Sequence, residues 1–392
     1  MSQLGYMEKL LDGVEVEWKE LGEIAEVGTG KSNRQDESEN GAYPFYVRSK
    51  SILKSNTYQF DEVAIIIPGE GGIGDIFHYV EGKYALHQRA YRIHVINEDV
   101  NTKFLYHLMR DSFKKYILAK SVGATSASIR KPMLEKFPIP IPPLNIQAEI
   151  VRILDTFTEL TEELTEELTA RQQQYAYYRD ECFNFNDNEV EWETLGVVSK
   201  IQRGASPRPI AKYVTDDKSG VPWIKIGDTR LGSKFVDNTA QRITFEGAEK
   251  SRVLKKGSFI MSNSMSYGRP YILGIEGAIH DGWASISDFE AKLNPDFLYH
   301  YLSSGNVKKY WESKINSSSV SNLNSDIIKA LPVPIPPIDE QERIASILDK
   351  FDTLTTSLTE GLPREIELRQ QQYEYYRDLL LSFPKPEVAA HD

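Results

Sequence analysis

An internal repeat decides the architecture of this 392-residue chain. Three blocks recur in the same order: EVEWKELG at 15–22 and EVEWETLG at 189–196, KFPIPIPPLNIQAEIVRILDTF at 136–157 and ALPVPIPPIDEQERIASILDKF at 330–351, and RQQQYAYYRD at 171–180 and RQQQYEYYRD at 369–378. Blocks that recur in the same order indicate that one structural unit is repeated, and this determines the overall architecture. The chain therefore contains two copies of one module.

The distance between the copies changes along the chain. It is 174 residues at the first block, 194 at the second and 198 at the third. The second copy thus gains about 19 residues after Gly204 and a further four between its second and third blocks. A variable stretch between constant flanks predicts a common frame that carries two different recognition surfaces.

Each module begins with a mixed α/β part, at roughly 13–137 and 189–331. The β-branched run 63–67 predicts a buried strand, and HYVEGKYAL predicts a hairpin about Gly82. The alternation at 222–228 predicts a strand. Helical spacing at 103–118 and at 296–312 predicts an equivalent helix in each copy.

A long helix follows each proline-rich segment, PIPIPP at 138–143 and PVPIPP at 332–337, because proline fixes an extended lead-in. Apolar residues then repeat about every 3.5 positions, which is typical of a coiled coil. We predict an α+β fold in which two pseudo-symmetric domains are separated by two long antiparallel helices. Two helices that each pack only on their own domain remain the alternative. The predicted helix-pair interface contains Ile150, Ile153, Phe157, Leu160, Leu164, Leu168, Ile344, Ile347, Phe351, Leu354, Leu358 and Leu362.

Composition excludes several classes of protein. The single cysteine, Cys182, rules out a disulfide framework and a cysteine-rich zinc site, and the seven histidines show no zinc-binding spacing such as HExxH. Apolar runs such as 63–67 are far shorter than the ~20 residues of a membrane helix. We therefore expect a soluble cytoplasmic protein without a metal site of its own.

Three strings imitate catalytic motifs. GTGKS at 28–32 lacks the first glycine of a phosphate-binding loop, since Ala25 stands there. GEGGIG at 69–74 matches the dinucleotide fingerprint, but a strand rather than a helix is expected after it, which favours a glycine turn. Asp75, Glu81 and Lys83 resemble a nuclease triad that the second copy does not repeat. His87 and His280 occupy equivalent positions and indicate a shared structural hydrogen bond.

What remains is binding, because loops of both copies are rich in the side chains that contact phosphates and base edges. The candidates in the first copy are Lys31, Asn33, Arg34, Arg48, Lys50, Ser51, Arg89, Ser126, Ser128, Arg130 and Lys131. The candidates in the second copy are Arg203, Ser206, Arg208, Lys225, Arg230, Asn263, Ser264, Tyr267, Arg269, Ser319 and Asn322.

Together these features carry a family resemblance. Two W-x-x-L-G openings, variable middles, P-x-P-x-P-P lead-ins and helices with I-L-D resemble the specificity subunits of type I restriction–modification systems. LDTFTELTEELTEEL at 154–168 is similar to the subfamily with a tetrad repeat in its central helix. The resemblance implies these domains: a short N-terminal helix at 1–12, target-recognition domains at 13–144 and 189–337, a central helix and linker at 145–188, a C-terminal helix at 338–380 and a tail at 381–392.

The resemblance also implies a function. Such subunits are non-catalytic, and each recognition domain reads one half of a bipartite target in double-stranded DNA. Two modification subunits bind the helices and methylate adenine with S-adenosylmethionine. Restriction subunits add an ATP-driven translocase and nuclease, so that S-adenosylmethionine, ATP and Mg²⁺ belong to partners. We expect no cofactor in this chain and no membrane partner.

The helices would then set the unread spacer between the half-sites. The central helix holds two tetrads, 161–164 and 165–168, and the C-terminal helix adds the four residues 363–366. One tetrad adds ~6 Å of helix, which is one to two base pairs at ~3.4 Å each. Gly361 and Pro363 predict a kink or a new start in the C-terminal helix.

Two rival hypotheses stay open: a coiled-coil adaptor with two protein-binding heads, and a nuclease that uses Asp75, Glu81 and Lys83. The net charge of −11 argues against DNA only when taken as a whole. Residues 145–181 carry nine acidic and three basic side chains, and residues 338–380 carry ten and five. The entire excess of acid therefore belongs to the helices, and the variable parts are not acidic.

Overall fold

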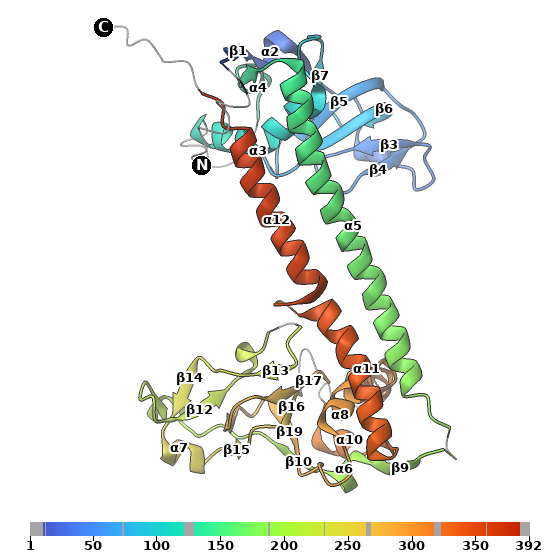
Figure 1. Cartoon of the computed structure of the whole chain (residues 1–392), viewed down its shortest axis with the longest axis vertical. Coiled ribbons are helices and arrows are strands. Elements are labelled where there is room, and N and C mark those ends of the chain that lie inside the picture. The colour runs from blue at the N-terminus through green and yellow to red at the C-terminus, as the bar shows by residue number, and fades with distance from the viewer. Residues whose placement is uncertain are drawn as a thin grey trace. The chain divides into compact units, whose positions relative to one another are not determined.

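The computed structural model describes residues 11, 13–72, 74–120, 129–186, 189–230, 232–263, 268–316, 323–357 and 359–384. The chain divides into two compact units. The first contains residues 1–162 and 368–392, and the second contains 163–367. Each unit therefore combines one mixed α/β part with segments of two long helices, and the long helix α5 (Leu144–Cys182) begins in the first unit and ends in the second (Figure 1).

The α/β part of the first unit is built on one six-stranded sheet, in the order β2-β7-β5-β6-β3-β4. Neighbouring strands are antiparallel except β3 and β6, which are parallel. The helix α3 (Thr102–Lys120) buries Phe104, Leu108 and Phe113 in the core beside it. The strands are β2 (Ala25–Thr29), β3 (Tyr43–Tyr46), β4 (Leu53–Ser55), β5 (Phe60–Pro68), β6 (His78–Leu86) and β7 (Ala90–Val95).

The strand β6 corrects one prediction. HYVEGKYAL forms a single strand rather than a hairpin about Gly82. Gly82 has φ +96° but remains paired with Glu62 of β5, so the ladder continues through the glycine. Glycine at a bend inside a strand and glycine in a hairpin turn leave the same sequence signal. The buried strand predicted at 63–67 is confirmed within β5.

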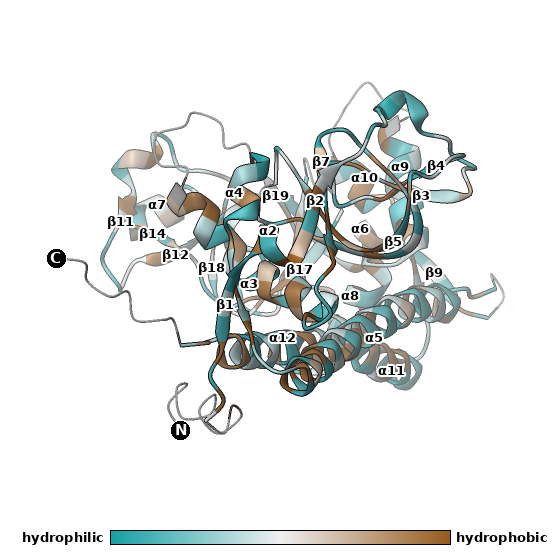
Figure 2. Cartoon of the chain, turned by 90° about the horizontal axis from the view of Figure 1, so that it is seen from above, coloured by the Kyte–Doolittle hydropathy of each residue, from teal (hydrophilic) through white to brown (hydrophobic). Residues whose placement is uncertain are grey.

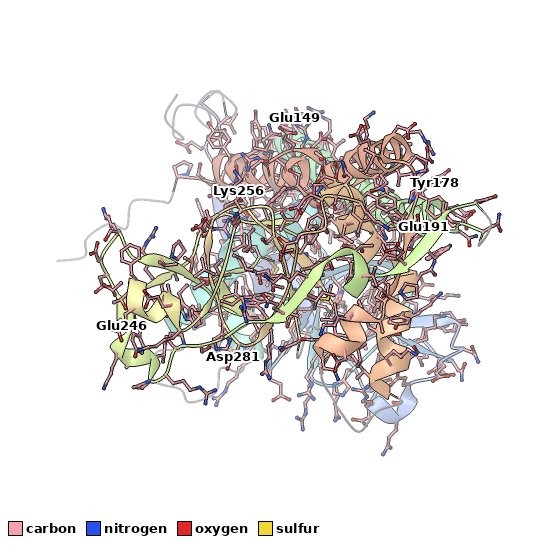
Figure 3. The ribbon with its side chains drawn as sticks, turned by 90° about the horizontal axis from the view of Figure 1, so that it is seen from below. Glu149, Tyr178, Glu191, Glu246, Lys256 and Asp281 are labelled. Carbon is pink, nitrogen blue, oxygen red and sulfur yellow. The ribbon has the colours of Figure 1, made fainter. Side chains whose placement is uncertain are left out.

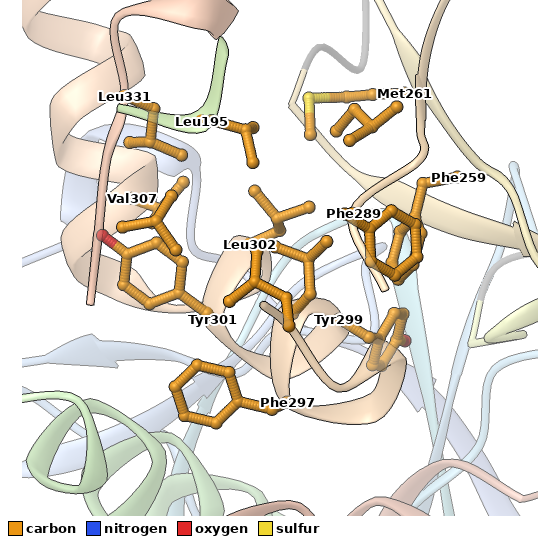
Figure 4. Packing of buried hydrophobic residues seen from close by; sticks show 14 of the residues in the cluster. Leu195, Phe259, Met261, Phe289, Phe297, Tyr299, Tyr301, Leu302, Val307 and Leu331 are labelled. Carbon is orange, nitrogen blue, oxygen red and sulfur yellow. The ribbon is translucent and has the colours of Figure 1, made fainter. Parts of the chain in front are cut away.

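The second unit has two five-stranded sheets, ordered β10-β19-β16-β17-β13 and β11-β14-β12-β18-β15. Its principal core packs aromatic side chains such as Phe259, Phe289 and Phe297 between the first sheet and the helices (Figure 4). The strands are β10 (Lys200–Arg203), β11 (Val214–Thr215), β12 (Val221–Ile224), β13 (Phe235–Val236), β14 (Gln241–Ile243), β15 (Arg252–Leu254), β16 (Phe259–Ser262), β17 (Pro270–Leu273), β18 (Gly277–Ile279) and β19 (Trp283–Ser287).

Two sequence expectations for this unit were too simple. The strand predicted at 222–228 ends at Ile224, and a 3₁₀ turn follows at Ile226–Asp228. The helix predicted at 296–312 is divided into α8 (Pro295–Leu302) and α9 (Gly305–Asn316). The other short helices of the two units are α2 (Leu21–Ile24), α4 (Lys131–Glu135), α6 (Leu195–Val198), α7 (Phe245–Glu249) and α10 (Ser325–Lys329).

The repeated motifs form the same small ladder in each unit. Strand β1 (Glu17–Glu20) pairs with β8 (Pro138–Ile141), and β9 (Glu191–Thr194) pairs with β20 (Pro332–Ile335). Proline has no backbone N–H to donate. It fits these two-stranded ladders because every other N–H of an edge strand points away from the neighbouring strand and makes no ladder hydrogen bond. A Cβ on Gly22 would lie 3.0 Å from Cβ of Glu135, and one on Gly196 would lie 2.8 Å from Cβ of Lys329. The glycine of W-x-x-L-G therefore allows two short helices to approach closely.

A buried glutamine fastens each long helix to its own domain. Gln147 donates to the carbonyl oxygens of Asp99 and Pro142, both at 2.7 Å, and accepts from the N–H of Asn101 at 2.8 Å. Gln341 makes the equivalent three hydrogen bonds, to Lys292, Pro336 and Asn294, at 2.8–2.9 Å. Both glutamines are fully buried, so the repeated Q-x-x-I start of the helix has a specific structural role.

A histidine–aspartate pair repeats in the same way. Nε2 of His107 lies 2.8 Å from Oδ1 of Asp155, and Nε2 of His300 lies 2.8 Å from Oδ1 of Asp349. The two pairs join α3 and α8 to the long helices. The D of the repeated I-L-D motif is thereby explained by a contact inside each unit.

The long helices differ in continuity. The helix α5 runs for 39 residues without interruption, whereas its counterpart is divided into α11 (Ile338–Thr356, 19 residues) and α12 (Gly361–Leu380, 20 residues) (Figure 1). The predicted kink or restart is confirmed: Gly361 has φ +79°, and Pro363 lies in the first turn of α12. The long helices of the two copies therefore contain the same number of helical residues. The four additional residues of the second copy correspond in number to the positions between α11 and α12.

The antiparallel helix pair appears separately in each unit. Phe157 of α5 stacks on Tyr376 of α12 with ring centroids 5.2 Å apart, and Phe351 of α11 stacks on Tyr178 of α5 at 5.9 Å. These are equivalent residues of the two copies. All three helices carry hydrophilic and hydrophobic faces (Figure 2), as a helix pair on a globular domain requires.

The predicted interface residues do not all occupy one seam. Ile150 and Ile344 are fully buried in the cores of their own units, beside Leu154 and Leu348. Leu160 remains 39% exposed, and Leu358 lies outside the described residues. Leu362 is buried, and the rest are partly buried: Ile153, Phe157, Leu164, Leu168, Ile347, Phe351 and Leu354. One side of each helix thus serves its domain and another serves the helix pair.

The chain ends described by the structure also belong to the first core. Leu11, Leu381 and Phe383 are buried there, and the indole N–H of Trp18 donates to the carbonyl of Pro384 at 3.0 Å. The first residues of the predicted tail are therefore packed. The predicted N-terminal helix at 1–12 lies outside the described residues except for Leu11.

Candidate DNA interface

Both units contain the same histidine turn. The backbone N–H of Arg89 donates to Nδ1 of His87 at 3.0 Å, and the N–H of Gly282 donates to Nδ1 of His280 at 2.9 Å. The predicted shared hydrogen bond is confirmed, and the two turns provide equivalent reference points for the candidate residues.

Glycine brings a second loop against each turn. A Cβ on Gly30 would lie 1.8 Å from the carbonyl oxygen of Leu86, and one on Gly204 would lie 2.0 Å from that of His280. No other residue fits where backbone approaches backbone so closely. The last glycine of the GTGKS string, Gly30, therefore has a packing role and places Lys31 beside the first turn. Gly204 places Ser206 beside the second turn in the same way.

In the first unit, Glu70 holds two candidate arginines. Its Oε1 accepts hydrogen bonds from Nη1 of Arg48 at 2.5 Å and from Nη1 of Arg89 at 2.7 Å. The hydrogen bond from Arg89 and the charges of both arginines lower the pKa of Glu70, so it stays ionised. We call Arg48, Glu70, His87 and Arg89 the first basic cluster. A shallow cavity of about 280 Å³ opens beside it.

The electrostatics of this cluster remain positive. Partial burial lowers the pKa of His87, and the charges of Arg48 and Arg89 lower it further. One carboxylate thus orients two guanidinium groups without neutralising both. Lys31 lies next to the cluster, because the N–H of the following residue, Ser32, donates to the carbonyl of Leu86.

In the second unit, the carboxylate that contacts the candidate residues is that of Asp281, which is labelled in Figure 3. Its side chain accepts from Oγ of Ser206 at 3.1 Å and pairs with Nη2 of Arg208 at 3.5 Å. Its carbonyl oxygen accepts from Nε of Arg203 at 3.1 Å and from Nδ2 of Asn263 at 3.3 Å. We call these five residues the second basic cluster.

Asp281 also stays ionised. Burial acts to raise its pKa, but the hydrogen bond from Ser206 and the charges of His280, Arg203 and Arg208 outweigh burial and lower the pKa. The side chain of Arg208 is 84% exposed. This arginine is therefore oriented by the carboxylate while its donors remain accessible to a ligand.

Several candidates lie outside the two clusters. Lys225 donates to Oε1 of Gln241 at 2.9 Å, and Arg269 lies over the ring of Tyr271. Arg34 pairs with Glu37, and Lys131 pairs with Glu135. Asn33, Lys50, Ser51, Arg130 and Arg230 are exposed, whereas Ser126, Ser128, Ser264, Tyr267, Ser319 and Asn322 lie outside the described residues.

The sequence did not identify the two central carboxylates, Glu70 and Asp281. An isolated acidic residue in a loop does not differ in sequence from a solvated surface residue. The sequence signal for Asp281 is its position directly after His280, which the repeat aligns with His87. Glu70 carries no such signal, since it belongs to the GEGGIG string.

The catalytic strings have other roles in the structure. Gly71, Gly72 and Gly74 have φ between +59° and +72°, and the strand β6 follows, so GEGGIG is a glycine turn. Asp75 pairs with Lys114 at 2.6 Å, while Lys83 lies over the ring of Tyr58. Among the described residues, no three His, Cys, Asp or Glu side chains cluster to hold a metal ion.

The helices contain no membrane-spanning candidate, as far as the described residues extend. The chain belongs to the family of the type I restriction modification DNA specificity domain, whose family model matches residues 13–171 and 189–368. This family assignment agrees with the resemblance carried by the sequence repeats.

Individual relatives match over the full length. The chain is 35% identical to the EcoR124I/EcoR124II specificity subunit of Escherichia coli, with all of both chains covered. It is 34% identical to a putative type I restriction enzyme specificity subunit of Haemophilus influenzae, with 96% of this chain and 98% of the relative covered. The fold is that of the S subunit of the type I restriction-modification system from M. genitalium, with a TM-score of 0.58, 15% identity and coverage of 95% and 97%.

Proposed function

We propose that the chain is the non-catalytic DNA-specificity subunit of a type I restriction–modification complex, and that each unit reads one half of a bipartite target. The observation that carries the proposal is the pair of basic clusters. They lie at equivalent histidine turns of the two copies, but they are built from different side chains. Two clusters that occupy equivalent positions but present different side chains are suited to recognising two different DNA sequences.

The geometry of each cluster supports DNA as the ligand. Arginine donates bidentately to guanine in the major groove and also binds phosphates. Glu70 and Asp281 hold arginines in defined orientations before a ligand arrives, which reduces the entropy lost on binding. The ion pairs themselves are exposed, and exposed pairs contribute little to stability. The contribution of these ion pairs to binding is therefore to orient the arginine side chains.

The long helices suit protein partners better than DNA. Glu162, Glu163, Glu166 and Glu167 are exposed on α5, and a cluster of acids repels phosphate. We propose that modification subunits with S-adenosylmethionine dock on these helices and that restriction subunits supply ATP-dependent cleavage. The uninterrupted α5 would then fix the number of unread base pairs between the half-sites.

A charge reversal in each cluster tests the assignment. The complex is reconstituted with its modification subunits, and its target is taken from the methylation motif of cells that carry the intact locus. We expect Arg89→Glu to reduce discrimination against base changes in one half-site and Arg208→Glu to do so in the other. A lost bidentate contact costs ~1–3 kcal/mol, or roughly 5- to 150-fold in affinity.

Matched controls separate local from general effects. Lys54→Glu and Lys218→Glu change the same charge at exposed lysines outside the clusters, one in each unit. Both should leave discrimination unchanged in both half-sites. If Arg89→Glu and Arg208→Glu weakened the same half-site, or both half-sites equally, the assignment of one reader to each unit would be wrong.

A further inference from the structure

The second unit contains a cavity of about 520 Å³ at the point where the end of α5 meets α8, α9 and α11. Its lining includes Arg179 of α5, Arg269, and Lys308 of α9. Two tyrosine side chains and one tryptophan side chain also line it. A volume of this size is in the range of small-molecule sites, which span roughly 300–1,000 Å³.

Pseudo-symmetry shows what is unusual about Arg179. Its equivalent in the first unit is Arg377, 198 residues later in the chain. Nε of Arg377 lies 3.1 Å from Oδ1 of Asp111, and both side chains are largely buried. The string FLYH occurs at 104–107 and again at 297–300, which is an offset of 193 residues. The same offset makes Ser304 the equivalent of Asp111. The second unit has therefore replaced the carboxylate with a hydroxyl.

The replacement leaves Arg179 without a counterpart of the Asp111 carboxylate. Its side chain is only 16% exposed, and Nε is buried without a hydrogen-bond partner. Its ion-pair contact is to the neighbouring Asp180 at 3.5 Å, and that carboxylate already accepts from the N–H of Gly305 at 2.8 Å. A largely buried guanidinium without a well-placed anion is costly. An anion in the cavity would remove this cost.

The charge around the cavity favours the same ligand. Three cationic side chains line it, against one carboxyl group, that of Asp352. Burial raises the pKa of Asp352, which weakens its opposition to an anion. Phosphate matches this set well, because arginine binds phosphate oxygens in a fork and lysine adds a point charge.

We propose that this cavity binds a small organic phosphate, whose phosphoryl oxygens take the place that the Asp111 carboxylate has in the first unit. The aromatic wall, with Tyr175 and Tyr299, would contact the organic part. A bound phosphate would connect α5 to α9 and so stabilise the second unit. The first unit would not respond, since its arginine already has a carboxylate.

Thermal unfolding of the full chain tests the proposal with three probes: adenosine monophosphate, inorganic phosphate and adenosine. We expect adenosine monophosphate at millimolar concentration to raise Tm, inorganic phosphate to raise it less, and neutral adenosine to leave it unchanged. Lys308→Gln should weaken the binding of adenosine monophosphate about tenfold. Lys309→Gln is the matched control, because it removes an adjacent exposed lysine that does not line the cavity, and it should bind normally.

Ser304→Asp is the decisive variant. It restores the residue of the first unit and can still accept from the N–H of Val307, as Ser304 Oγ does. We expect it to raise Tm without ligand and to abolish the shift with adenosine monophosphate. A shift that survives in Ser304→Asp would place binding elsewhere and overturn the proposal, as would the absence of any shift in the unmodified chain.

Discussion

Replacing the buried glutamines should loosen each long helix from its domain. Gln147→Leu has almost the same volume but leaves one N–H and two carbonyl oxygens without their partner. An unsatisfied buried polar group costs ~1–3 kcal/mol. Three such groups, partly rescued by water, give an expected loss of about 3–5 kcal/mol in the free energy of unfolding of the first unit. Gln341→Leu should cost the second unit the same amount, because its three contacts are equivalent.

Urea unfolding followed by tryptophan fluorescence measures both losses. Gln173→Leu is the matched control, since Gln173 is exposed on α5, and such surface changes stay within ±0.5 kcal/mol. Hydrogen exchange would show increased opening at the start of α5 in Gln147→Leu and at the start of α11 in Gln341→Leu. The reasoning is refuted if either variant unfolds like the control, or if the two losses differ by more than twofold.

Three further predictions concern the helices. Gly361→Ala should destabilise the second unit by about 2–4 kcal/mol, because a Cβ at φ +79° would lie 2.6 Å from the carbonyl oxygen of Thr353. The control is Gly257→Ala, which should cost only ~1–2 kcal/mol because Gly257 has φ +90° and an added Cβ there meets no other atom. If both variants lost the same free energy of unfolding in denaturant, the clash with Thr353 would be contradicted. Burial lowers the pKa of His107, so the native state binds fewer protons than the unfolded state. Stability that is present above the unfolded pKa of about 6.5 should therefore fall as the pH drops below it, and His107→Gln should flatten the dependence of Tm on pH between about 7 and 5. A third TEEL inserted after Leu168 should lengthen the spacer in the methylation motif by one to two base pairs, at 1.5 Å per helical residue, and leave both half-sites unchanged.

The sequence predicted the frame better than the sites. The two modules and the long helices follow from the repeated blocks, and the shared hydrogen bond follows from the equivalent positions of His87 and His280. The break in the C-terminal helix could also be predicted from the sequence, because Gly361 and Pro363 disfavour a helix interior locally. The continuous strand through Gly82 was not, because its pairing with β5 is a tertiary contact. The same holds for Glu70 and Asp281, which acquire their role only when distant loops meet.

The break between α11 and α12 changes how the helices can set a spacer. Extra residues in the C-terminal copy would suggest a longer helix there, yet α5 alone contains as many helical residues as α11 and α12 together. Gly361 and Pro363 prevent the additional residues from extending the helix, because neither residue suits a helix interior. The helices α11 and α12 therefore provide the same total helical length as α5 and no more. The length of α5 is consequently the quantity that controls the proposed spacer, and a change in the number of residues within the break should leave that spacer as it is.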